Sequence, residues 1–357
     1  MDELRRPVLR ISRSQLVHNI AAVQKQLAPS ALMLVMKDDA YGHGVDTVVD
    51  AALVQPGVAL FGGYDVDTSL QIRSRAGSGA RVFAWAIARD EEIRRALREG
   101  IELGVGTSSY LERVIVVAAA EKQTARVHLK IDTGLRRNGI RTEEWPDFVA
   151  RAVRAQFAGV LSIVGVWSHL AEASDAEDDV SASEFAQAVE IVRAAGADPA
   201  SLHLTASAAS WWRPELRGTV CRVGAFCYGI RSAEGPEIPG IRPIATLESR
   251  VLAAENDVAH IGIGALHGLP STLGGAPVAT LGGQRELLRI DAVTSAVRGW
   301  EGMRVGDTVR IFGPGDHGEM DATSLAERND TVGEEILTRL TERVRRVIED
   351  GDGERVG

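Results

Sequence analysis

The sequence of 357 residues predicts an α/β fold, in which an N-terminal (β/α)8 barrel of the TIM type is followed by a mostly-β domain. Three observations predict it. Short apolar runs alternate with amphipathic helical stretches, several runs are as continuously apolar as parallel strands buried on both faces, and the alternation stops near residue 236. A chain of this length commonly divides into more than one domain. We therefore expect a barrel over residues 1–235 and a β domain over residues 236–357.

Nine short apolar runs are the expected strands of the barrel. They are separated by helix-like stretches, some of which begin with a capping residue and some of which end at glycine. Eight or nine such repeats indicate a (β/α)8 barrel, and a doubly wound open sheet is the alternative. The expected strands are VLRIS, ALMLVMK, VALFGG, RVFAWAI, IELGVG, ARVHLKIDTG, GVLSIVGVWSH, SLHLTAS and TVCRVGAFCYG; the expected helices include SQLVHNIAAVQKQLA, VDTVVDAALVQ, DEEIRRALREG, SYLERVIVVAAAE and SASEFAQAVEIVRAAGA.

Beyond the stretch EGPEIPG the pattern changes to short β-like runs separated by Gly, Pro and Asp. These runs predict the separate β domain. It is expected to close with one charged helix, GEEILTRLTERVRRVIED, because its apolar side chains share one helical face. The β-like runs are TLESRVLAAE, VAHIGIG, APVATLGG, ELLRIDAVTSAV and DTVRIFG, and the apolar face consists of Ile336, Leu337, Leu340, Val344 and Val347.

Composition and charge narrow the possible partners. Asp and Glu (49) outnumber Lys and Arg (40), and the net charge of -9 argues against nucleic acid, which is bound by clustered positive charge. The only cysteines, Cys221 and Cys227, are too few for a disulfide framework and lack zinc-ligand spacing. Neither a signal-peptide core nor a membrane-spanning apolar run is found. We expect a cytoplasmic protein with no metal site and no membrane partner.

Polar residues follow several of the expected strands, where function is usually built in a βα barrel. Lys37 ends the run ALMLVMK, and a lysine held where burial lowers its pKa can act as a nucleophilic amine that forms a Schiff base with an aldehyde cofactor. The alternative is a lysine whose stem merely packs at a strand end. The full set is Lys37, Tyr41, His43, Lys130, Asp132, Arg137, His169, His203, Ser207, Arg222, Gly224 and Tyr228.

Two of these positions have a further chemical reading. Ser207 in TASAAS and the backbone of RVGAF each follow a strand and are suited to a phosphate, although loop capping is an equal alternative. Arg222 is suited to a carboxylate or a ring nitrogen, or to an acidic neighbour. Each of these signals is weak alone, and only the ordered set of residues is specific.

The ordered set resembles the alanine racemase family of pyridoxal-phosphate enzymes. The resemblance extends from about Pro7 to about Val347 and implies a (β/α)8 barrel, a C-terminal β domain, an amino-acid substrate, a pyridoxal 5′-phosphate cofactor and a homodimer with shared active sites. The matching motifs are MKDDAYGHG, HLKIDTGLRRNGI, VWSHLAEAS, HLTASAAS and CRVGAFCYGI and, more faintly, VAHIGIGALHG and RIDAV.

The resemblance implies a role for each matching residue. Lys37 would hold the cofactor covalently and act as one catalytic base, while Tyr41 and Ser207 would bind the phosphate together with the backbone at Gly224 and Ala225.

Further matching residues would surround the cofactor ring. Arg222 would face the pyridine nitrogen, with His169 beside the ring and His203 in its hydrogen-bonding surroundings. Arg137 would orient the phenolate and the substrate, and Lys130 would support Arg137. Because a guanidinium does not give up its proton, the pyridine nitrogen opposite Arg222 stays unprotonated, which favours brief removal of the α-proton over decarboxylation.

The substrate half of the pattern departs from the family. A racemase needs a proton-exchanging group on each face of Cα. The family supplies the second as a tyrosine from the β domain, but Ile263 stands there in IGIGA. Where the family has Met-Asp, this chain has Ile290-Asp291. Ala206 stands at the position of an expected Asn, and Glu334 stands at the position of an expected Tyr.

His267 is the best substitute for the missing tyrosine, because imidazole titrates near neutral pH and GALHGLP is the loop expected at the partner's cofactor. The alternative is an ordinary loop histidine. Three functions therefore stay open: an amino-acid racemase or epimerase of divergent specificity, a single-base pyridoxal-phosphate enzyme (β-elimination, aldol-type cleavage or decarboxylation), and a non-catalytic pyridoxal-phosphate-binding protein.

Overall fold

The computed structural model describes residues 6–55 and 57–349, and it divides the chain into two compact units. The unit that we call the barrel unit combines Val23–Lys37 with Ala52–Gly224. The other, the β unit, combines the residues up to Ala22 with Asp38–Ala51 and the residues from Ala225 onward. The chain therefore passes between the units four times, after Ala22, Lys37, Ala51 and Gly224.

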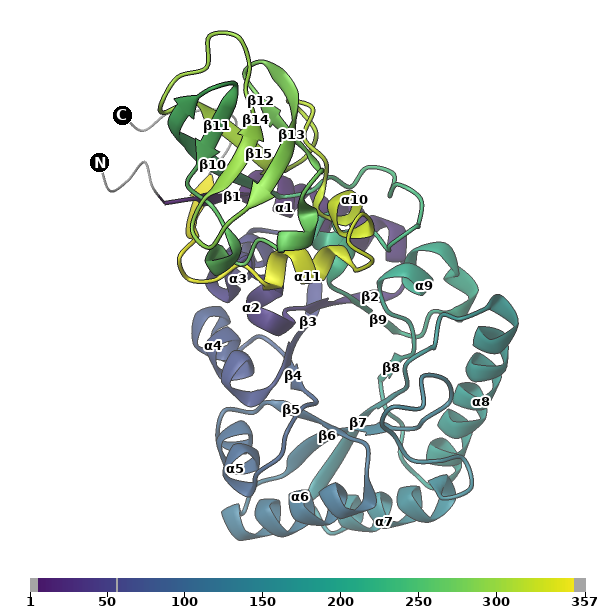
Figure 1. Cartoon of the computed structure of the whole chain (residues 1–357). Helices are drawn as coiled ribbons and strands as arrows, with labels where there is room; N and C mark the ends of the chain where they lie inside the picture. Colours follow the sequence, from purple (N-terminus) through teal and green to yellow (C-terminus); the bar gives the residue numbers. More distant parts are fainter. Residues whose placement is uncertain (1–5, 56, 350–357) are drawn as a thin grey trace. The chain divides into compact units, whose positions relative to one another are not determined.

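The barrel unit contains eight parallel strands in the order β8-β7-β6-β5-β4-β3-β2-β9, which confirms the predicted (β/α)8 class. Figure 1 shows these strands in a ring with α4 to α8 outside it. The two ends of the order meet where the Arg222 backbone N–H donates to the Thr205 carbonyl at 3.2 Å. The strands are β2 (Ala31–Val35), β3 (Val58–Tyr64), β4 (Val82–Ala84), β5 (Glu102–Val105), β6 (Ala125–Lys130), β7 (Leu161–Trp167), β8 (Ser201–His203) and β9 (Val220–Val223).

Helices connect the strands, and their starts follow from local sequence. Asp65, Thr107 and Ser174 each accept a hydrogen bond from a backbone N–H of the first turn of the helix that follows, as N-cap residues do. The helices are α1 (Arg13–Leu27), α3 (Val45–Val54), α4 (Val66–Ala76), α5 (Asp90–Arg98), α6 (Ser108–Glu121), α7 (Trp145–Phe157), α8 (Asp175–Ala194) and α9 (Ser207–Trp212).

Side chains fill the interior of the barrel, as expected for a ring of this size. Met33, Leu60, Phe83, Trp167 and Val220 form one buried cluster there. The predicted strands are therefore apolar along their whole length because both faces are covered.

The β unit is built on a second eight-stranded sheet, in the order β11-β14-β13-β12-β15-β10-β1-β16. β10 also pairs with β11, which closes six strands into a ring. The elements are β1 (Val8–Ser12), β10 (Ala245–Glu255), β11 (Val258–Ile261), β12 (Pro277–Thr280), β13 (Gly283–Ile290), β14 (Ser295–Arg298), β15 (Thr308–Phe312), α10 (Ala322–Glu327), α11 (Gly333–Thr338) and β16 (Arg345–Glu349).

The structure corrects the sequence-based assignment of VLRIS to the barrel. This segment is β1, which pairs antiparallel with β10 and parallel with β16 in the β unit. The physical reason is that β2 to β9 already complete the ring, so a ninth strand finds no open edge there.

The predicted C-terminal helix is also wrong. Only Gly333–Thr338 is helical, and Arg345–Glu349 forms β16 along the edge of β1; the last predicted residue, Asp350, lies outside the described residues. Leu340 and Val344 are buried as predicted. Helix propensity is a weak preference, and here the backbone hydrogen bonds available at a sheet edge outweigh it.

No helix in the described part of the chain has both the length and the apolar character needed to cross a lipid bilayer.

Candidate active site

The turn that follows β2 has an unusual backbone. Lys37–Tyr41, labelled α2, does not have right-handed α-helical dihedrals: φ is +54° at Asp38, +53° at Asp39, +52° at Ala40 and +57° at Tyr41. A left-handed conformation costs roughly 1–2 kcal/mol for each residue with a side chain. Four such residues in succession are therefore a strained device, of the kind that concentrates at functional sites.

Strand ends place the predicted cofactor residues of the barrel unit at one end of the barrel. Lys37 follows β2 by two residues, Lys130 ends β6, His169 follows β7 by two residues, and His203 ends β8. Parallel strands have their carboxyl ends at the same edge, so all four lie at the C-terminal end of the barrel.

Four positive charges act on one histidine at this end. The pKa of His169 falls to about 3, mainly because the ring is buried. Further contributions come from the charges of Arg222, Lys130, Arg137 and Lys37. Such a cluster of cations is suited to an anionic ligand.

Lys130 and Arg222 lie over the same aromatic ring. The Lys130 ammonium is 4.4 Å from the Trp167 ring centroid, and the Arg222 guanidinium carbon is 5.3 Å from it. Burial lowers the pKa of Lys130 to about 8, and the charges of Arg222 and Arg137 contribute. Cation–π contacts of this kind orient both side chains.

Carbonyl groups of the barrel hold Arg222 in place. Its Nη1 donates to the His203 carbonyl at 2.7 Å, and its Nη2 donates to the carbonyls of Ser168 and Leu204, both at 2.9 Å. Burial lowers the pKa of Arg222 to about 10, which still leaves the guanidinium charged at neutral pH.

Ser207 and Gly224 come together as the sequence predicts for a phosphate site. The Gly224 N–H donates to the Ser207 hydroxyl at 3.3 Å, although the two residues lie 17 positions apart. Ser207 begins α9, and Ala206 before it supplies no side-chain cap. A phosphate can accept hydrogen bonds from a hydroxyl and a backbone N–H that lie side by side.

Arg137 lies in the loop between β6 and α7. The bridge between Ile131 and Ile140 closes this loop, and the Asp132 carboxylate accepts a hydrogen bond from the Arg136 N–H at 2.9 Å. The Arg137 side chain is exposed, so it is free of the packing that fixes Arg222.

Two buried ring nitrogens support the fit of a cofactor. Among the described residues, neither Trp167 Nε1 nor His169 Nδ1 has a hydrogen-bond partner. Buried polar atoms are nearly always paired, so unpaired ones mark a place where a ligand supplies the partner. With an amine at Lys37 for an aldehyde and cations for a phosphate and a phenolate, the donor set fits pyridoxal phosphate.

The β unit contains the other predicted residues. Tyr41 is buried, and burial raises the pKa of its hydroxyl, with a contribution from the charge of Glu334. The Tyr41 ring lies 5.0 Å from the Tyr228 ring, and the His43 ring stacks on the Tyr228 ring at 5.1 Å. Ala225 begins a short 3-10 turn and is also buried.

Apart from Ala206, which precedes α9 in the barrel unit, the departures from the expected pattern also lie in the β unit. Ile263 is fully buried, and its carbonyl accepts a hydrogen bond from the Ser295 hydroxyl at 2.6 Å. Ile290 ends β13 and is half-buried, while the Asp291 carboxylate pairs with Arg289 at 2.9 Å. Neither isoleucine side chain has a proton to exchange, and the Asp291 carboxylate is engaged by Arg289.

The ring of His267 makes a specific contact within the β unit. Its Nδ1 accepts a hydrogen bond from the Gly264 N–H at 3.0 Å, so the neutral ring carries its proton on Nε2. Burial lowers the pKa of His267. In this tautomer His267 has no free lone pair that could accept a proton from the substrate. His267 can therefore act as a base only if its hydrogen bond with the Gly264 N–H is broken. The assignment of His267 as second base stays a prediction.

Three residues that contact the predicted site residues, directly or through one another, were not predicted: Trp167, His128 and Glu102. Trp167 carries the two cations described above, and His128 and Glu102 connect to His203 in the barrel interior. A signal existed for His128, because it precedes Lys130 by two residues and so shares its face of the strand. No local pattern pointed to Glu102.

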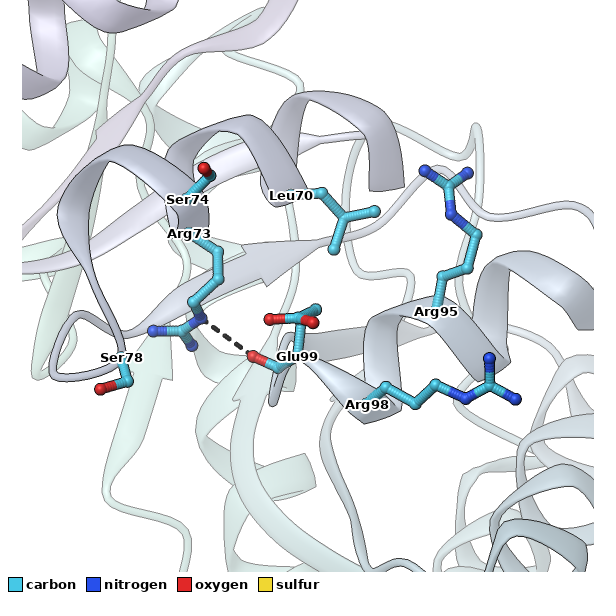
Figure 2. Close-up of a pocket in the computed structure, with 7 residues that line it drawn as sticks. All are labelled: Leu70, Arg73, Ser74, Ser78, Arg95, Arg98 and Glu99. Carbon is cyan, nitrogen blue, oxygen red and sulfur yellow. Dashed lines mark hydrogen bonds between the residues drawn. The ribbon is translucent and has the colours of Figure 1, made fainter.

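A separate hollow on the barrel unit does not belong to this site. This hollow has a volume of about 510 Å³. Figure 2 shows the side chains that line it, several of which come from α4 and α5. Its guanidinium groups already have partners: Arg73 donates to the Glu99 carbonyl at 2.9 Å, Arg95 pairs with Asp67 and Arg98 pairs with Glu121. The lining residues are Leu70, Arg73, Ser74, Ser78, Arg95, Arg98 and Glu99.

The fold and the donor set together define a (β/α)8-barrel enzyme of the pyridoxal-phosphate class. Comparison with known proteins narrows this class. The sequence profile of the alanine racemase N-terminal domain matches residues 11–232, and that of the alanine racemase C-terminal domain matches residues 246–348.

Similar proteins agree with these profiles. An alanine racemase of Thermobifida fusca is 34% identical, over 95% of this chain and 96% of its own, and one of Beutenbergia cavernae is 33% identical, over 92% and 94%. The crystal structure of alanine racemase from a D-cycloserine-producing Streptomyces lavendulae has a TM-score of 0.91 at 30% identity and covers 97% of both chains. The chain belongs to the alanine racemase family, whose enzymes are isomerases that use pyridoxal 5′-phosphate.

Proposed function

We propose that this enzyme racemises a small neutral amino acid, with alanine as the first substrate to test. The observation that carries the proposal is the placement of Lys130 and Arg222 over the Trp167 ring, with Lys37 and His169 following strands at the same C-terminal end of the barrel. The names of the relatives support alanine as substrate.

Each residue of the barrel unit has a proposed task toward the cofactor. Ser207 and the Gly224 N–H bind the phosphate, and Arg222 donates a hydrogen bond to the pyridine nitrogen. His169, whose Nδ1 has no hydrogen-bond partner among the described residues, would lie beside the cofactor ring. Lys37 would bind the aldehyde carbon of the cofactor covalently. When bound, pyridoxal phosphate withdraws electrons from the α-carbon of an attached amino acid and so acidifies its α-proton.

The other tasks concern the phosphate and the substrate. We propose that Tyr41 and the Ala225 backbone also bind the phosphate, while Arg137, supported by Lys130, orients the substrate carboxylate. Lys37, once its amine is free, removes and returns the α-proton on one face. His203 keeps Arg222 in position.

A second candidate function is proton exchange on one face only, without inversion. Two observations favour it: Ile263 has no proton to exchange, and the lone pair of His267 Nδ1 is occupied by the Gly264 N–H. An enzyme with Lys37 alone would return the α-proton to the face from which it came.

Single enantiomers in deuterium oxide separate the two functions. The protein loaded with pyridoxal phosphate is incubated with L-alanine and with D-alanine, and deuterium incorporation and configuration are measured. Deuterium with inversion supports racemisation. Deuterium with full retention supports single-face exchange, and no incorporation with alanine or other small neutral amino acids contradicts both. The variant Lys37→Ala, in parallel, controls for exchange by free cofactor.

The same assay tests His267. If His267 is the second base, His267→Gln lowers the inversion rate by about 10²–10⁴-fold, the usual contribution of a positioned acid or base. Exchange on the Lys37 face continues, which gives an internal control. An unchanged inversion rate in a folded variant excludes His267 from this role.

Homodimerisation is part of the proposal, because the family resemblance places the second base on the partner's β domain. Sedimentation equilibrium is expected to give twice the chain mass of 38.2 kDa. A monomer with full inversion activity would contradict a shared site. A cytoplasmic location also stays a prediction.

A further inference from the structure

A buried carboxylate lies at the end of the barrel opposite the candidate site. Glu102 is the first residue of β5, and its side chain is 2% exposed. Arg81 donates to it through Nε at 2.9 Å and Nη2 at 2.8 Å, and Arg126 donates through Nε at 3.1 Å and Nη2 at 2.8 Å. The Nε2 of His128 lies 2.8 Å from the same carboxylate.

These contacts fix the charge of Glu102. Burial acts to raise the pKa of the carboxyl, but the hydrogen bonds of His128 and Arg81 outweigh it and hold the pKa well below its usual range. An ionised carboxylate accepts hydrogen bonds and donates none. Arg81 and Arg126 are donors only, and the charge they supply keeps Glu102 ionised.

The donor direction then follows along a chain of contacts. Because Glu102 only accepts, His128 must carry its proton on Nε2, which leaves a lone pair on Nδ1. This Nδ1 lies 2.8 Å from His203 Nε2, which must therefore be the donor. The remaining lone pair of His203, on Nδ1, lies 3.3 Å from Arg222 Nη1. The hydrogen bonds run in one direction, from Arg222 to Glu102.

The surroundings keep both imidazoles neutral. Burial lowers the pKa of His128 and of His203; Glu102 partly offsets the shift at His128, while His128 and Arg222 add to that at His203. Aromatic rings pack against both: Phe83 lies 4.5 Å from the His128 ring, and Trp167 stacks on His203 at 5.6 Å. Water does not compete in such an interior, so a wrongly placed proton is costly.

We propose that Glu102 is a positioning residue for Arg222, which sets the tautomers of His128 and His203 so that a lone pair faces the guanidinium. The proposal rests on the proposed function, in which Arg222 meets the pyridine nitrogen of the cofactor. The carboxylate acts through two histidines from the far end of the barrel, and it makes no contact with the cofactor.

The isosteric change Glu102→Gln removes the charge and introduces an N–H donor. His128 is then free to place its proton on Nδ1, and His203 in turn presents an N–H to Arg222. Two donors facing one another weaken the support of the guanidinium, whose bonds to the three backbone carbonyls persist.

The test reads the tautomers directly. Full-length protein with ¹⁵N-labelled histidine is studied by NMR with and without bound pyridoxal phosphate, and the signals are assigned through His128→Asn and His203→Asn. In the wild type, both rings are expected to be neutral with the proton on Nε2. Glu102→Gln is expected to lose this tautomer at one ring or both and to shift the visible absorption maximum of the bound cofactor. Glu102→Asp, which keeps the charge, is expected to restore the tautomers.

Glu121→Gln is the matched control, because Glu121 also pairs with two arginines, Arg94 and Arg98, but on the surface. It is expected to change neither readout. A proton on Nδ1 of His128 in the wild type overturns the proposal, as does a folded Glu102→Gln protein with unchanged tautomers. If Glu102→Gln does not fold, the wild-type tautomers still decide. Because they are also measured without cofactor, this outcome is separate from a failure of the proposed function, which the Lys37→Ala spectrum reports.

Discussion

The barrel unit and the β unit differ in how closely they follow the family pattern. In the barrel unit Lys37 follows β2, Arg222 lies in β9 with its guanidinium held by backbone carbonyls, and Ser207 begins α9 beside the Gly224 N–H, all matching the family pattern. In the β unit Ile263 is buried at the position where the sequence resemblance leads us to expect a proton-exchanging tyrosine, and His267 uses its Nδ1 lone pair within the unit. The cofactor is the same molecule for every member, so the residues that bind it are constrained, whereas residues toward the substrate are free to diverge.

The largest effect is expected from a substitution in the barrel unit. Lys37→Ala removes the amine that holds the cofactor and moves the α-proton, so we expect a loss of at least about 10²–10⁴-fold in α-proton exchange. The visible absorption of lysine-bound cofactor should disappear as well. Lys25→Ala, at an exposed lysine of α1, should leave both unchanged. An unaltered spectrum in Lys37→Ala would contradict the assignment of Lys37 as the residue that binds the cofactor covalently.

An intermediate effect concerns acid stability in the β unit. His43 is 1% exposed, and burial lowers its pKa to about 4. The folded protein thus favours the neutral ring, and its contribution to stability is complete above the unfolded value near 6.5 and is lost as the pH falls toward 4. At 1.36 kcal/mol per pKa unit this amounts to about 3 kcal/mol.

His43→Gln, which stays neutral, should lose less unfolding free energy than the wild type between pH 7 and pH 4. Urea unfolding at several pH values measures the difference. His317→Gln, at an exposed histidine, provides the comparison. Parallel pH curves for His43→Gln and the wild type would show that the ring is protonated without penalty.

The smallest effect is expected from a substitution in the β unit. Ile263→Val should lower the unfolding free energy by about 0.5–1.5 kcal/mol, because it removes one buried methylene, and should leave the exchange rate of the folded enzyme unchanged. Ile261→Val is the matched control, since Ile261 is equally buried two residues earlier. A slower exchange in Ile263→Val alone would show that this side chain contacts the substrate.

The common location of three predicted site residues could be inferred from the chain, for a specific reason. Lys37, Lys130 and Arg222 each belong to a short apolar run that forms a strand, so their common location follows from the barrel itself. The connection of Glu102 to Arg222 was not predictable, because it depends on side chains of β5, β6, β8 and β9 that meet only inside the closed ring.

The local apolar runs of the sequence therefore indicated the barrel class and the strand-end residues, and its ordered motifs indicated the cofactor through their resemblance to the alanine racemase family. Only the tertiary structure decided which sheet VLRIS joins and that Arg345–Glu349 is a strand, because both depend on which edge is unpaired. It also decided the tautomers of His267 and His128. A tautomer depends on the partner that each ring nitrogen meets, and for His128 that partner is distant in the chain.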